Sequence, residues 1–382
     1  MIQQLQQRSN LMNSEKRVGL LSLANMKVLI IAPYPPNEAP SQRFRFEQYL
    51  SYLEQHDIQF KYSPFWNLTT WKILYKKGNQ FYKMSGLLMG FIRRFMLMFT
   101  IGQYHFIWLH REAAPIGPPV FEWMICKLWR KKIIYDFDDA IWLNNVSTVN
   151  SFAGKLKWHG KVKSICKWSW KVTCGNNYLC QYAGEQRGSS KYVLCLPTTI
   201  DTKVYKLKFV SPHKLTIGWT GSQSTVAYLQ MVIAPLQQLQ TEIDFDVVVI
   251  SNLDAQLPLK NYRFVQWQQN SEVQDLSQID IGLMPLTDDE WAQGKCGFKL
   301  LQYMAMGILS VASPVGVNEF ILDNEQAGFI AQNEVAWKNA LRKLLSDEKL
   351  RKQMGEFGKQ RLQNFYSVDS QKENYLHLFQ KN

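Results

Sequence analysis

The chain has 382 residues, of which 46% are hydrophobic and 20% are charged. This balance excludes a disordered or collagen-like protein, and the length allows two globular domains. The six cysteines form no Cys-x-x-Cys pair and no Cys/His spacing typical of a metal site, so we expect free thiols in a reducing cytoplasm.

The net charge of +13 is unevenly distributed. Residues 1–210 hold 29 Lys and Arg against 12 Asp and Glu, whereas residues 211–382 hold 15 against 19. A basic half beside a mildly acidic half indicates that one domain faces an anionic surface. Membrane phospholipid and nucleic acid are the two candidates.

Residues 1–25 are rich in Gln, Asn and Ser and lack the uninterrupted apolar core of a signal peptide, so we expect a loose extension. The apolar run 27–33 predicts a buried parallel strand. Ser41 is a candidate N-cap for a helix that runs to about residue 56. Arg43 and Arg45 in its first turn would oppose the helix dipole unless an anion binds there, and plain surface arginines are the alternative.

Residues 66–101 mix aromatic and basic side chains and depart from a simple α/β rhythm. Their longest apolar run is interrupted by Arg93 and Arg94 and is too short to span a bilayer. Such a mixture suits the headgroup layer of a membrane, and a pair of core helices with snorkelling lysines is the alternative. A second helix of this kind, with six lysines, is predicted over 155–171.

Polar residues follow two predicted strands of the first half. One strand ends at His110 and Arg111, and the next leads into Asp136, Asp138 and Asp139. Ligands settle at the carboxyl ends of parallel strands, so these residues are candidates for a site. His110 could bond a ligand hydroxyl or assist a proton transfer, or it could be structural. The three carboxylates could bind a divalent ion.

The second half contains the most informative stretch, residues 280–307. A short apolar strand is followed by a polar loop in which Gly294 and Gly297 bracket Lys295. A helix then carries Lys299 and apolar residues at helical spacing, and Gly307 ends it. A glycine-bracketed helix N-terminus with two lysines can bind an anion, although an ordinary crossover with solvated lysines has the same pattern.

Four segments together resemble the retaining glycosyltransferases of family four (glycosyl transferases group 1), and the resemblance extends from residue 27 to about 380. They are Tyr-Asp-Phe-Asp-Asp-Ala-Ile-Trp, Leu-Pro-Thr-Thr-Ile-Asp, Gly-Trp-Thr-Gly-Ser and Gly-Phe-Lys-Leu-Leu-Gln-Tyr-Met-Ala-Met-Gly. The resemblance implies an α/β protein of GT-B architecture, with two Rossmann-like, doubly wound domains facing across a cleft. We expect an acceptor domain over 26–205, a nucleotide-sugar domain over 206–365, and a C-terminal helix over 366–382 that crosses back to the first domain.

The resemblance also implies the site residues. The family usually has glutamates at the positions of Gly294 and Gln302 and an Arg/Lys pair after the first strand of the second domain, where this chain has only Thr220-Gly221-Ser222. Lys295 and Lys299 would supply the missing charge. The expected donor-binding residues are Thr220, Gly221, Ser222, Lys295, Gly297, Phe298, Lys299, Gln302 and Glu319. The expected acceptor-binding residues are Arg43 and Arg45, and the expected catalytic residues are His110, Arg111 and Asp139.

The expected function is therefore transfer of a sugar, with retention, from a nucleotide-sugar donor to a glycan or lipid-linked acceptor in cell-surface polysaccharide biosynthesis. We expect no catalytic metal and no cofactor, and a cytoplasmic protein bound peripherally to the anionic inner face of the cell membrane. An epimerase or hydrolase on the same fold is a second hypothesis. A basic nucleic-acid-binding protein is a third, although the aromatic and basic segments match no recognition module.

Overall fold

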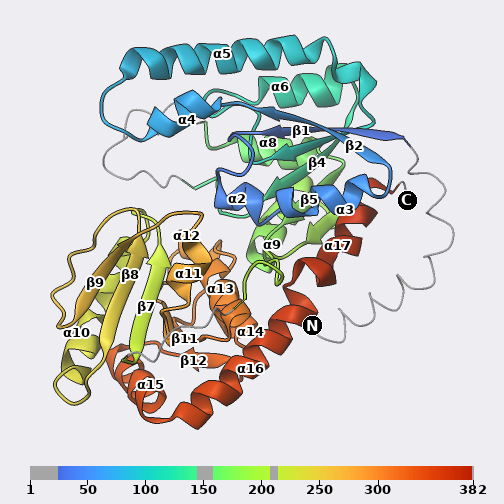
Figure 1. Ribbon diagram of the computed structural model, residues 1–382. Coiled ribbons are helices and arrows are strands. Elements are labelled where there is room, and N and C mark those ends of the chain that lie inside the picture. The colour runs from blue at the N-terminus through green and yellow to red at the C-terminus, as the bar shows by residue number, and fades with distance from the viewer. Residues whose placement is uncertain (1–24, 144–157, 207–213, 381–382) are drawn as a thin grey trace, which may run out of the picture.

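The computed structural model describes residues 25–143, 158–206 and 214–380. Most of the predicted extension 1–25, residues 155–157 of the predicted lysine-rich helix and residues 381–382 of the predicted C-terminal helix lie outside the described residues. Two six-stranded sheets form the centres of two domains, which lie one above the other in Figure 1.

The first sheet has the strand order β2-β1-β3-β4-β5-β6, and every pairing is parallel. Its central strands β1, β3, β4 and β5 are almost continuously buried, as expected when helices cover both faces, whereas the edge strand β2 alternates. They are β1 (Met26–Ala32), β2 (Ile58–Pro64), β3 (Phe106–His110), β4 (Lys132–Phe137), β5 (Lys171–Cys174) and β6 (Val193–Cys195).

The helices of the first domain are short except for one. They are α2 (Pro40–Arg43), η2 (Glu47–Tyr49), α3 (Leu50–Glu54), α4 (Leu68–Leu74), α5 (Gln80–Met98), η3 (Ile101–Gln103), α6 (Val120–Trp123), η4 (Met124–Leu128), α8 (Lys161–Trp168) and α9 (Asn177–Arg187). Figure 1 shows α5 as the outermost helix, on the side of this domain that faces away from the second domain.

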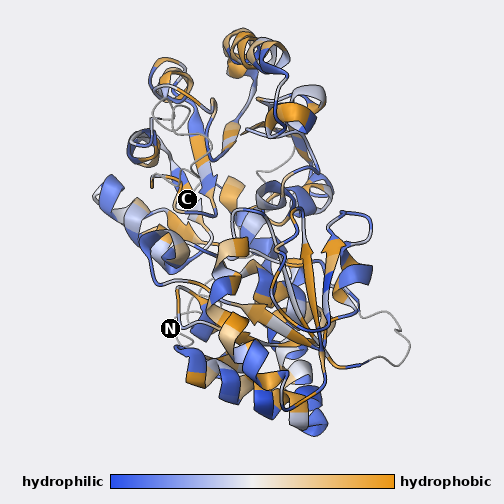
Figure 2. Ribbon diagram, turned by 90° about the vertical axis from the view of Figure 1, so that its left-hand side faces the viewer, coloured by the Kyte–Doolittle hydropathy of each residue, from blue (hydrophilic) through white to orange (hydrophobic). Residues whose placement is uncertain are grey.

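The second sheet has the order β12-β11-β10-β7-β8-β9, again with parallel pairing throughout. Figure 2 shows its hydrophobic strands enclosed by helices with one hydrophobic and one hydrophilic face. The strands are β7 (Thr216–Gly221), β8 (Asp246–Ser251), β9 (Tyr262–Gln266), β10 (Ile281–Met284), β11 (Leu309–Ala312) and β12 (Gly328–Ile330). The helices are η6 (Val226–Leu229), α10 (Gln230–Leu239), α11 (Glu272–Leu276), α12 (Glu290–Gln293), α13 (Phe298–Met306), α14 (Asn318–Ile321), α15 (Glu334–Ser346) and α16 (Glu348–Phe365).

The chain then returns to the first domain through α17 (Val368–Leu376) and η7 (His377–Phe379). Tyr375 stacks on Tyr49 with ring centroids 3.8 Å apart, and Phe379 packs edge-on against Trp108. The end of the chain thus completes the first domain's core. The predicted α/β class, the two doubly wound domains and the helix that crosses back are all confirmed.

Two predicted helices differ from the structure. The helix expected from Ser41 to residue 56 is broken into α2, η2 and α3, and Ala39 rather than Ser41 is the N-cap of α2. Within 155–171, the described helix covers only Lys161–Trp168, and its first residue is buried against Glu112 with a 2.7 Å ion pair. Lys171 is also buried, and it donates to backbone carbonyls of η7 and Gln380.

The basic residues of 66–101 also divide into two groups. Arg94 is fully buried and donates to the carbonyls of Ala32 and Ala113 and to Ser63 Oγ. Arg93 donates to two carbonyls at the end of β2. These arginines hold α5 in place, so the expectation that they face a headgroup layer is corrected. No helix in the described part of the chain is both long and apolar enough to cross a membrane.

Candidate active site

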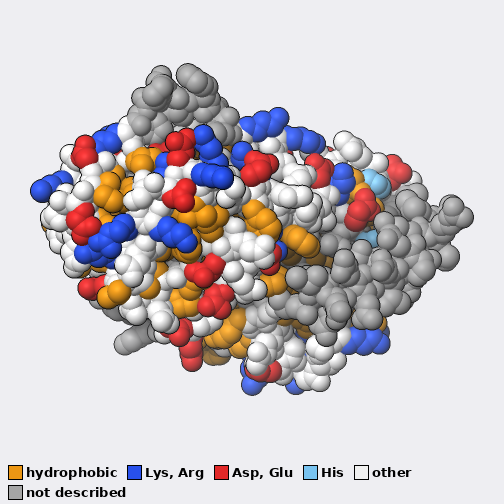
Figure 3. Space-filling view, turned by 90° about the horizontal axis from the view of Figure 1, so that it is seen from below, with side chains coloured by type: hydrophobic (Ala, Val, Ile, Leu, Met, Phe, Trp, Pro, Cys, Tyr) orange, Lys and Arg blue, Asp and Glu red, His pale blue; other side chains and the backbone are white. Residues whose placement is uncertain are grey.

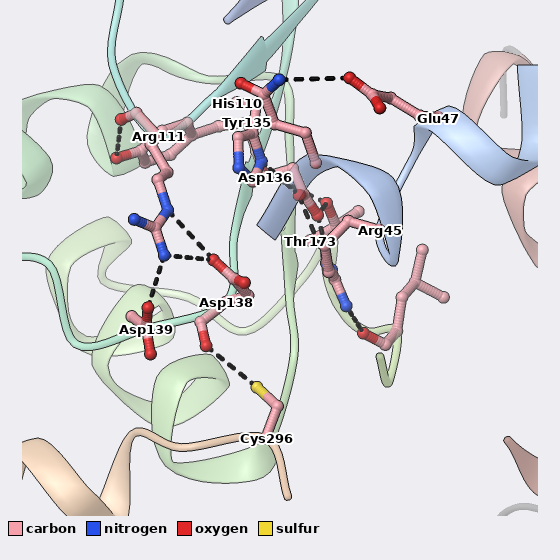
Figure 4. A network of polar contacts seen from close by, with 12 residues as sticks. Arg45, Glu47, His110, Arg111, Tyr135, Asp136, Asp138, Asp139, Thr173 and Cys296 are labelled. Carbon is pink, nitrogen blue, oxygen red and sulfur yellow. Dashed lines mark hydrogen bonds and ion pairs between the residues drawn. The ribbon is translucent and has the colours of Figure 1, made fainter. Parts of the chain in front are cut away.

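Asp136, at the end of β4, is the centre of a buried polar network in the first domain (Figure 4). Arg45 Nη2 lies 2.6 Å from its Oδ1, His110 Nδ1 lies 2.9 Å from its Oδ2, and Thr173 Oγ1 donates at 2.7 Å. Burial alone would raise the pKa of Asp136, but Arg45 and His110 outweigh it and hold the pKa well below the usual range. The carboxylate is therefore charged and structurally engaged.

This network corrects the expectation for Arg45 and changes that for His110. Arg45 is fully buried and its donors are used by Asp136 and the carbonyl of Leu196, so it is a structural residue and not an acceptor ligand in this structure. His110 is also fully buried, and its Nε2 has no hydrogen-bond partner among the described residues. Its predicted catalytic role would require a movement that gives a ligand access to Nε2.

A second cluster links the two domains and contains two of the residues predicted to be catalytic. Arg111, whose φ of 59° turns the chain sharply at the end of β3, lies 2.8 Å from Asp138 and also pairs with Asp139. Lys295 of the second domain reaches Asp139 Oδ1 at 3.0 Å. Burial opposes the charge on Asp139, but Lys295 and Arg111 lower the pKa of its carboxyl. The structure thus brings Arg111, Asp139 and Lys295 together.

The loop around Lys295 is docked on the first domain through its backbone as well. Asn176 Nδ2, at the start of α9, donates to the carbonyls of Gln293 and Lys295 at 3.3 and 3.0 Å. The Cys296 thiol lies 3.1 Å from the carbonyl oxygen of Asp138. The loop therefore joins the two domains at this edge of the first sheet.

This docking explains why glycine occupies position 294. A Cβ atom there would lie 2.8 Å from the Cβ of Ala140 and 2.9 Å from its backbone nitrogen. Real Cβ atoms almost never approach other atoms so closely, so the glutamate usual in the resembling family would force the loop and Ala140 apart.

Lys299, in the first turn of α13, is the cation with the fewest protein partners in this region. Its Nζ lies 5.4 Å from the centroid of Trp219, and no hydrogen bond or ion pair to it is found among the described residues. Burial, reinforced by the nearby charge of Lys295, lowers the pKa of Lys299 to about 7. The charged form of Lys299 is disfavoured by burial and by Lys295, so an anionic ligand beside both lysines would stabilise it.

The other predicted donor residues divide by accessibility. Thr220, near the end of β7, is buried and donates its N–H to Tyr303 Oη at 3.2 Å. The N–H of Ser222 is bonded to Thr225 Oγ1, so an anion could use it only by displacing that hydroxyl. Gly221 packs against the Trp219 ring, which would lie 2.4 Å from an added Cβ. This close contact leaves no room for a side chain at position 221. It is the one observation here that favours contact between a ligand and the backbone of Gly221.

Three further donor predictions fall near the same cleft. Gly297 caps α13 with a φ of 65°, and the Phe298 ring packs on Phe44 of the first domain at a tilt of 46°, with ring centroids 4.3 Å apart. Glu319 is exposed in the first turn of α14. Gly316, three residues earlier, brings this loop close to the carbonyls of Ala292 and Gln293. All three remain predictions as ligand contacts.

Gln302 lies in a buried network that the sequence did not reveal. Its Nε2 donates to Tyr205 Oη at 3.3 Å and to Glu272 Oε1 at 3.2 Å. Tyr205 in turn donates to Glu272, and Arg43 of the first domain pairs with the same carboxylate at 3.5 Å. Because both amide protons are used, only the amide oxygen of Gln302 could accept a bond from a ribose hydroxyl. Arg43 is better placed to join the domains than to bind an acceptor.

We expect Gln302→Ala to abolish most of the preference for a nucleotide over its 2′,3′-dideoxy analogue. One net hydrogen bond corresponds to about a two- to tenfold difference in affinity. Calorimetry with both nucleotides measures it. Tyr205→Phe is the matched control, because it perturbs the same network and leaves the amide in place. A preference that is equal in wild type and Gln302→Ala would place the ribose elsewhere.

The predicted carboxylate cluster has no arrangement suited to a metal. Asp136, Asp138 and Asp139 each pair with a basic side chain. In the part of the chain that the structure describes, no three His, Cys, Asp or Glu side chains are grouped to hold an ion. Transfer without a catalytic metal remains a prediction.

Sequence reasoning missed Glu272, Asn176 and Cys296. Asn176 follows a strand at the carboxyl edge of the sheet and caps the next helix, which is a local signal that could have identified it. Glu272 opens α11 after β9, but its partners Gln302 and Tyr205 lie 30 and 67 residues away in the sequence. No local pattern predicts that network.

The sequence of the second domain matches a known family of proteins. Residues 214–347 match the family model for glycosyl transferases group 1. The match includes the Lys295 loop and α13, and it confirms there the resemblance predicted from the sequence. A search of curated proteins found no significant match.

Solved structures match almost the whole chain. Anabaena HepE in complex with UDP and glucose is 14% identical, with a TM-score of 0.64, covering 92% of this chain and 99% of HepE. A sucrose-phosphate synthase from Thermosynechococcus elongatus is 14% identical, with a TM-score of 0.64 and coverages of 93% and 98%. A glycosyltransferase from Rickettsia africae is 12% identical, with a TM-score of 0.62 and coverages of 93% and 97%. The fold is therefore that of the GT-B glycosyltransferases.

Proposed function

We propose that the protein is a retaining glycosyltransferase that moves a sugar from a nucleoside-diphosphate donor to a glycan or lipid-linked acceptor. The observation that carries the proposal is the pair Lys295 and Lys299, which opens α13 at the interface with the carboxyl edge of the first sheet. The family match over 214–347 and the fold shared with HepE, solved with UDP-glucose, support a nucleotide-sugar donor.

In this proposal the donor diphosphate binds between the two lysines. Lys299 has no other charge partner among the described residues, and Lys295 would exchange Asp139 for a phosphate oxygen. Their charge stabilises the leaving diphosphate as the glycosidic bond breaks. Asp139, released from Lys295 and still paired with Arg111, would then face the acceptor. Retention would follow a front-face path, in which a donor phosphate oxygen takes the acceptor proton.

We further propose that the protein acts in cell-surface polysaccharide biosynthesis, such as that of lipopolysaccharide, at the anionic inner face of the cell membrane. The excess of basic residues in the first half supports this location, because lipid-linked acceptors are found at such a surface. A nucleic-acid partner is not proposed.

A screen of UDP- and GDP-sugars by thermal stabilisation tests the donor assignment. A ligand at a hundred times its Kd stabilises the folded state by about 2.7 kcal/mol, which is readily measured as a rise in Tm. The stabilising donor is then incubated with lipid-linked acceptors, and the anomeric configuration of the product is determined. No stabilisation by any nucleotide sugar would contradict the proposal. Conversion or hydrolysis of the donor without an acceptor would favour an epimerase or hydrolase.

We expect donor affinity to fall as the pH rises above 7. The pKa of Lys299 is lowered to about 7, and binding a diphosphate requires its charged form. Affinity is therefore full below this pKa and falls by up to about tenfold per pH unit above it, until the pKa of the bound form is reached. Calorimetry with a nucleotide sugar from pH 6 to 9 measures the profile. Lys299→Arg, charged throughout, should flatten it, and a wild-type profile equally flat would contradict the assignment.

A further inference from the structure

The outward face of α5 is strongly apolar, which is the reverse of an ordinary surface helix. The large side chains Phe81 and Phe99 are 80% and 67% exposed. Between them the same face exposes Tyr82, Met84, Leu88, Met89, Ile92, Phe95 and Met96. We call these nine residues the α5 face. Monomeric proteins rarely expose an apolar patch this extended, so the face needs an occupant.

The inward side of α5 shows that this orientation is fixed. Its buried positions, Gly86, Gly90, Arg94 and Met98, recur every four residues. A Cβ at Gly86 would lie 2.3 Å from Thr70 Oγ1, and one at Gly90 would lie 2.5 Å from the Phe65 ring. The three hydrogen bonds of Arg94 lock the rotation. The helix cannot turn its apolar side inward without breaking these contacts.

Charges around the α5 face match an anionic partner. The sequence contains no Asp or Glu from residue 58 to residue 111. Lys72, Lys76 and Lys77 are exposed beside the turn that leads from α4 into α5. By contrast, Figure 3 shows acidic and basic side chains interspersed at the opposite end of the molecule, away from α5. The exposed lysines, in a stretch of the sequence without acidic residues, complement phosphate groups.

A neighbouring element extends the apolar surface. Phe91 of α5 packs on Phe121 of α6 with ring centroids 6.2 Å apart, and Figure 1 shows the two helices side by side. The segment α6–η4 exposes Val120, Trp123, Leu128 and Trp129, with Lys127 and Arg130 also exposed. Aromatic, aliphatic and basic side chains in this mixture suit the boundary between headgroups and acyl chains.

We propose that α5 lies in the plane of an anionic membrane, with the α5 face among the acyl chains and Lys72, Lys76 and Lys77 against lipid phosphates. A second copy of the chain is a poorer occupant, because both partners would bring the same exposed lysines to the contact. This inference rests on the proposed function in one respect, the lipid-linked acceptor that the protein would meet at the membrane. It assigns attachment to apolar insertion by α5, and it excludes Lys161 and Lys171 from lipid contact because both are buried.

The test is flotation of the full-length protein with vesicles of phosphatidylglycerol and phosphatidylcholine. We expect the variant Leu88→Gln, Ile92→Gln, Phe95→Gln, Met96→Gln to lose at least about tenfold of the bound fraction. The matched control is Val204→Gln, Val335→Gln, which changes two exposed apolar residues elsewhere and should bind like wild type. Lys72, Lys76 and Lys77 changed to Gln should weaken binding at low salt, where screening is least. Wild type should retain part of its binding at high salt.

Three outcomes would overturn the inference. The first is wild type that does not float with the vesicles. The second is a four-residue variant that binds the vesicles as well as wild type. The third is a wild-type dimer that binds no lipid and that this variant converts to a monomer. Thermal stabilisation by nucleotide sugars, measured on the same proteins, separates the two proposals. Donor binding without flotation removes only the membrane inference, and flotation without donor binding removes only the proposed function.

Discussion

Lys299→Ala is expected to lower turnover or donor affinity by about ten- to a hundredfold. A charge-assisted contact contributes roughly 1.5–3 kcal/mol, and Lys299 is the cation without another charge partner in the described cleft. Steady-state kinetics with the stabilising nucleotide sugar measures the loss. The fold should survive, because the change removes a partly buried ammonium that makes no hydrogen bond within the described residues.

Lys338→Ala is the matched control for this prediction. Lys338 lies on α15 and pairs with Glu242 at 3.2 Å, away from the cleft, so its loss should leave the kinetics unchanged. Wild-type kinetics in Lys299→Ala would exclude the diphosphate role. A similar loss in both variants would show that the effect is general and not specific to the site.

Asp136→Asn is expected to have the largest effect on stability, a loss of about 3–5 kcal/mol of unfolding free energy. Removing one member of a buried ion pair leaves the other charge without compensation, and Arg45 is fully buried. Denaturant unfolding at pH 7 measures the loss. The pKa of Asp136 is depressed, so its stabilisation is present above the unfolded value of about 3.9 and is lost only as the pH falls through the lower folded value.

Two further variants make this prediction specific. Asp244→Asn, at an exposed pair with Lys214, should cost less than about 1 kcal/mol. The double variant Arg45→Met, Asp136→Leu should recover much of the loss, because replacing both charges by apolar groups removes the uncompensated charge. Equal losses of unfolding free energy in Asp136→Asn and Asp244→Asn would show that the buried network contributes no more to stability than an exposed ion pair.

Local signals predicted the parts of the fold that depend on nearby residues. The stretch 298–306 has helical spacing and ends at a glycine, and α13 occupies those residues with Gly307 as its C-cap. The alternation of apolar strands and helices predicted the two parallel sheets. In contrast, α2 ends at Arg43 because the chain must turn Arg45 inward to Asp136, which is 91 residues away.

The site could be predicted only in part for the same reason. Strand ends and glycine-bracketed lysines identified Arg111, Asp139 and Lys295, which do meet. The sequence did not predict which cations are buried. Arg94 and Lys171 have the same chemistry as exposed cations, and only tertiary contacts distinguish them. Likewise, Gly294 could be recognised as a departure from the family pattern, but the reason, contact with Ala140, depends on how the domains approach.

The return of the chain through α17 has a mechanical consequence. The link near Ile200 and the link at Ser367 run side by side, since Ile200 N–H bonds to the Tyr366 carbonyl and Val368 N–H bonds to the Ile200 carbonyl, at 2.9 and 3.1 Å. Because these hydrogen bonds couple the two links, we expect any rotation of one domain against the other to occur about both links together, as about a single hinge. Such a rotation would separate Lys295 from Asp139 and Arg43 from Glu272. These two ion pairs therefore oppose separation of the domains.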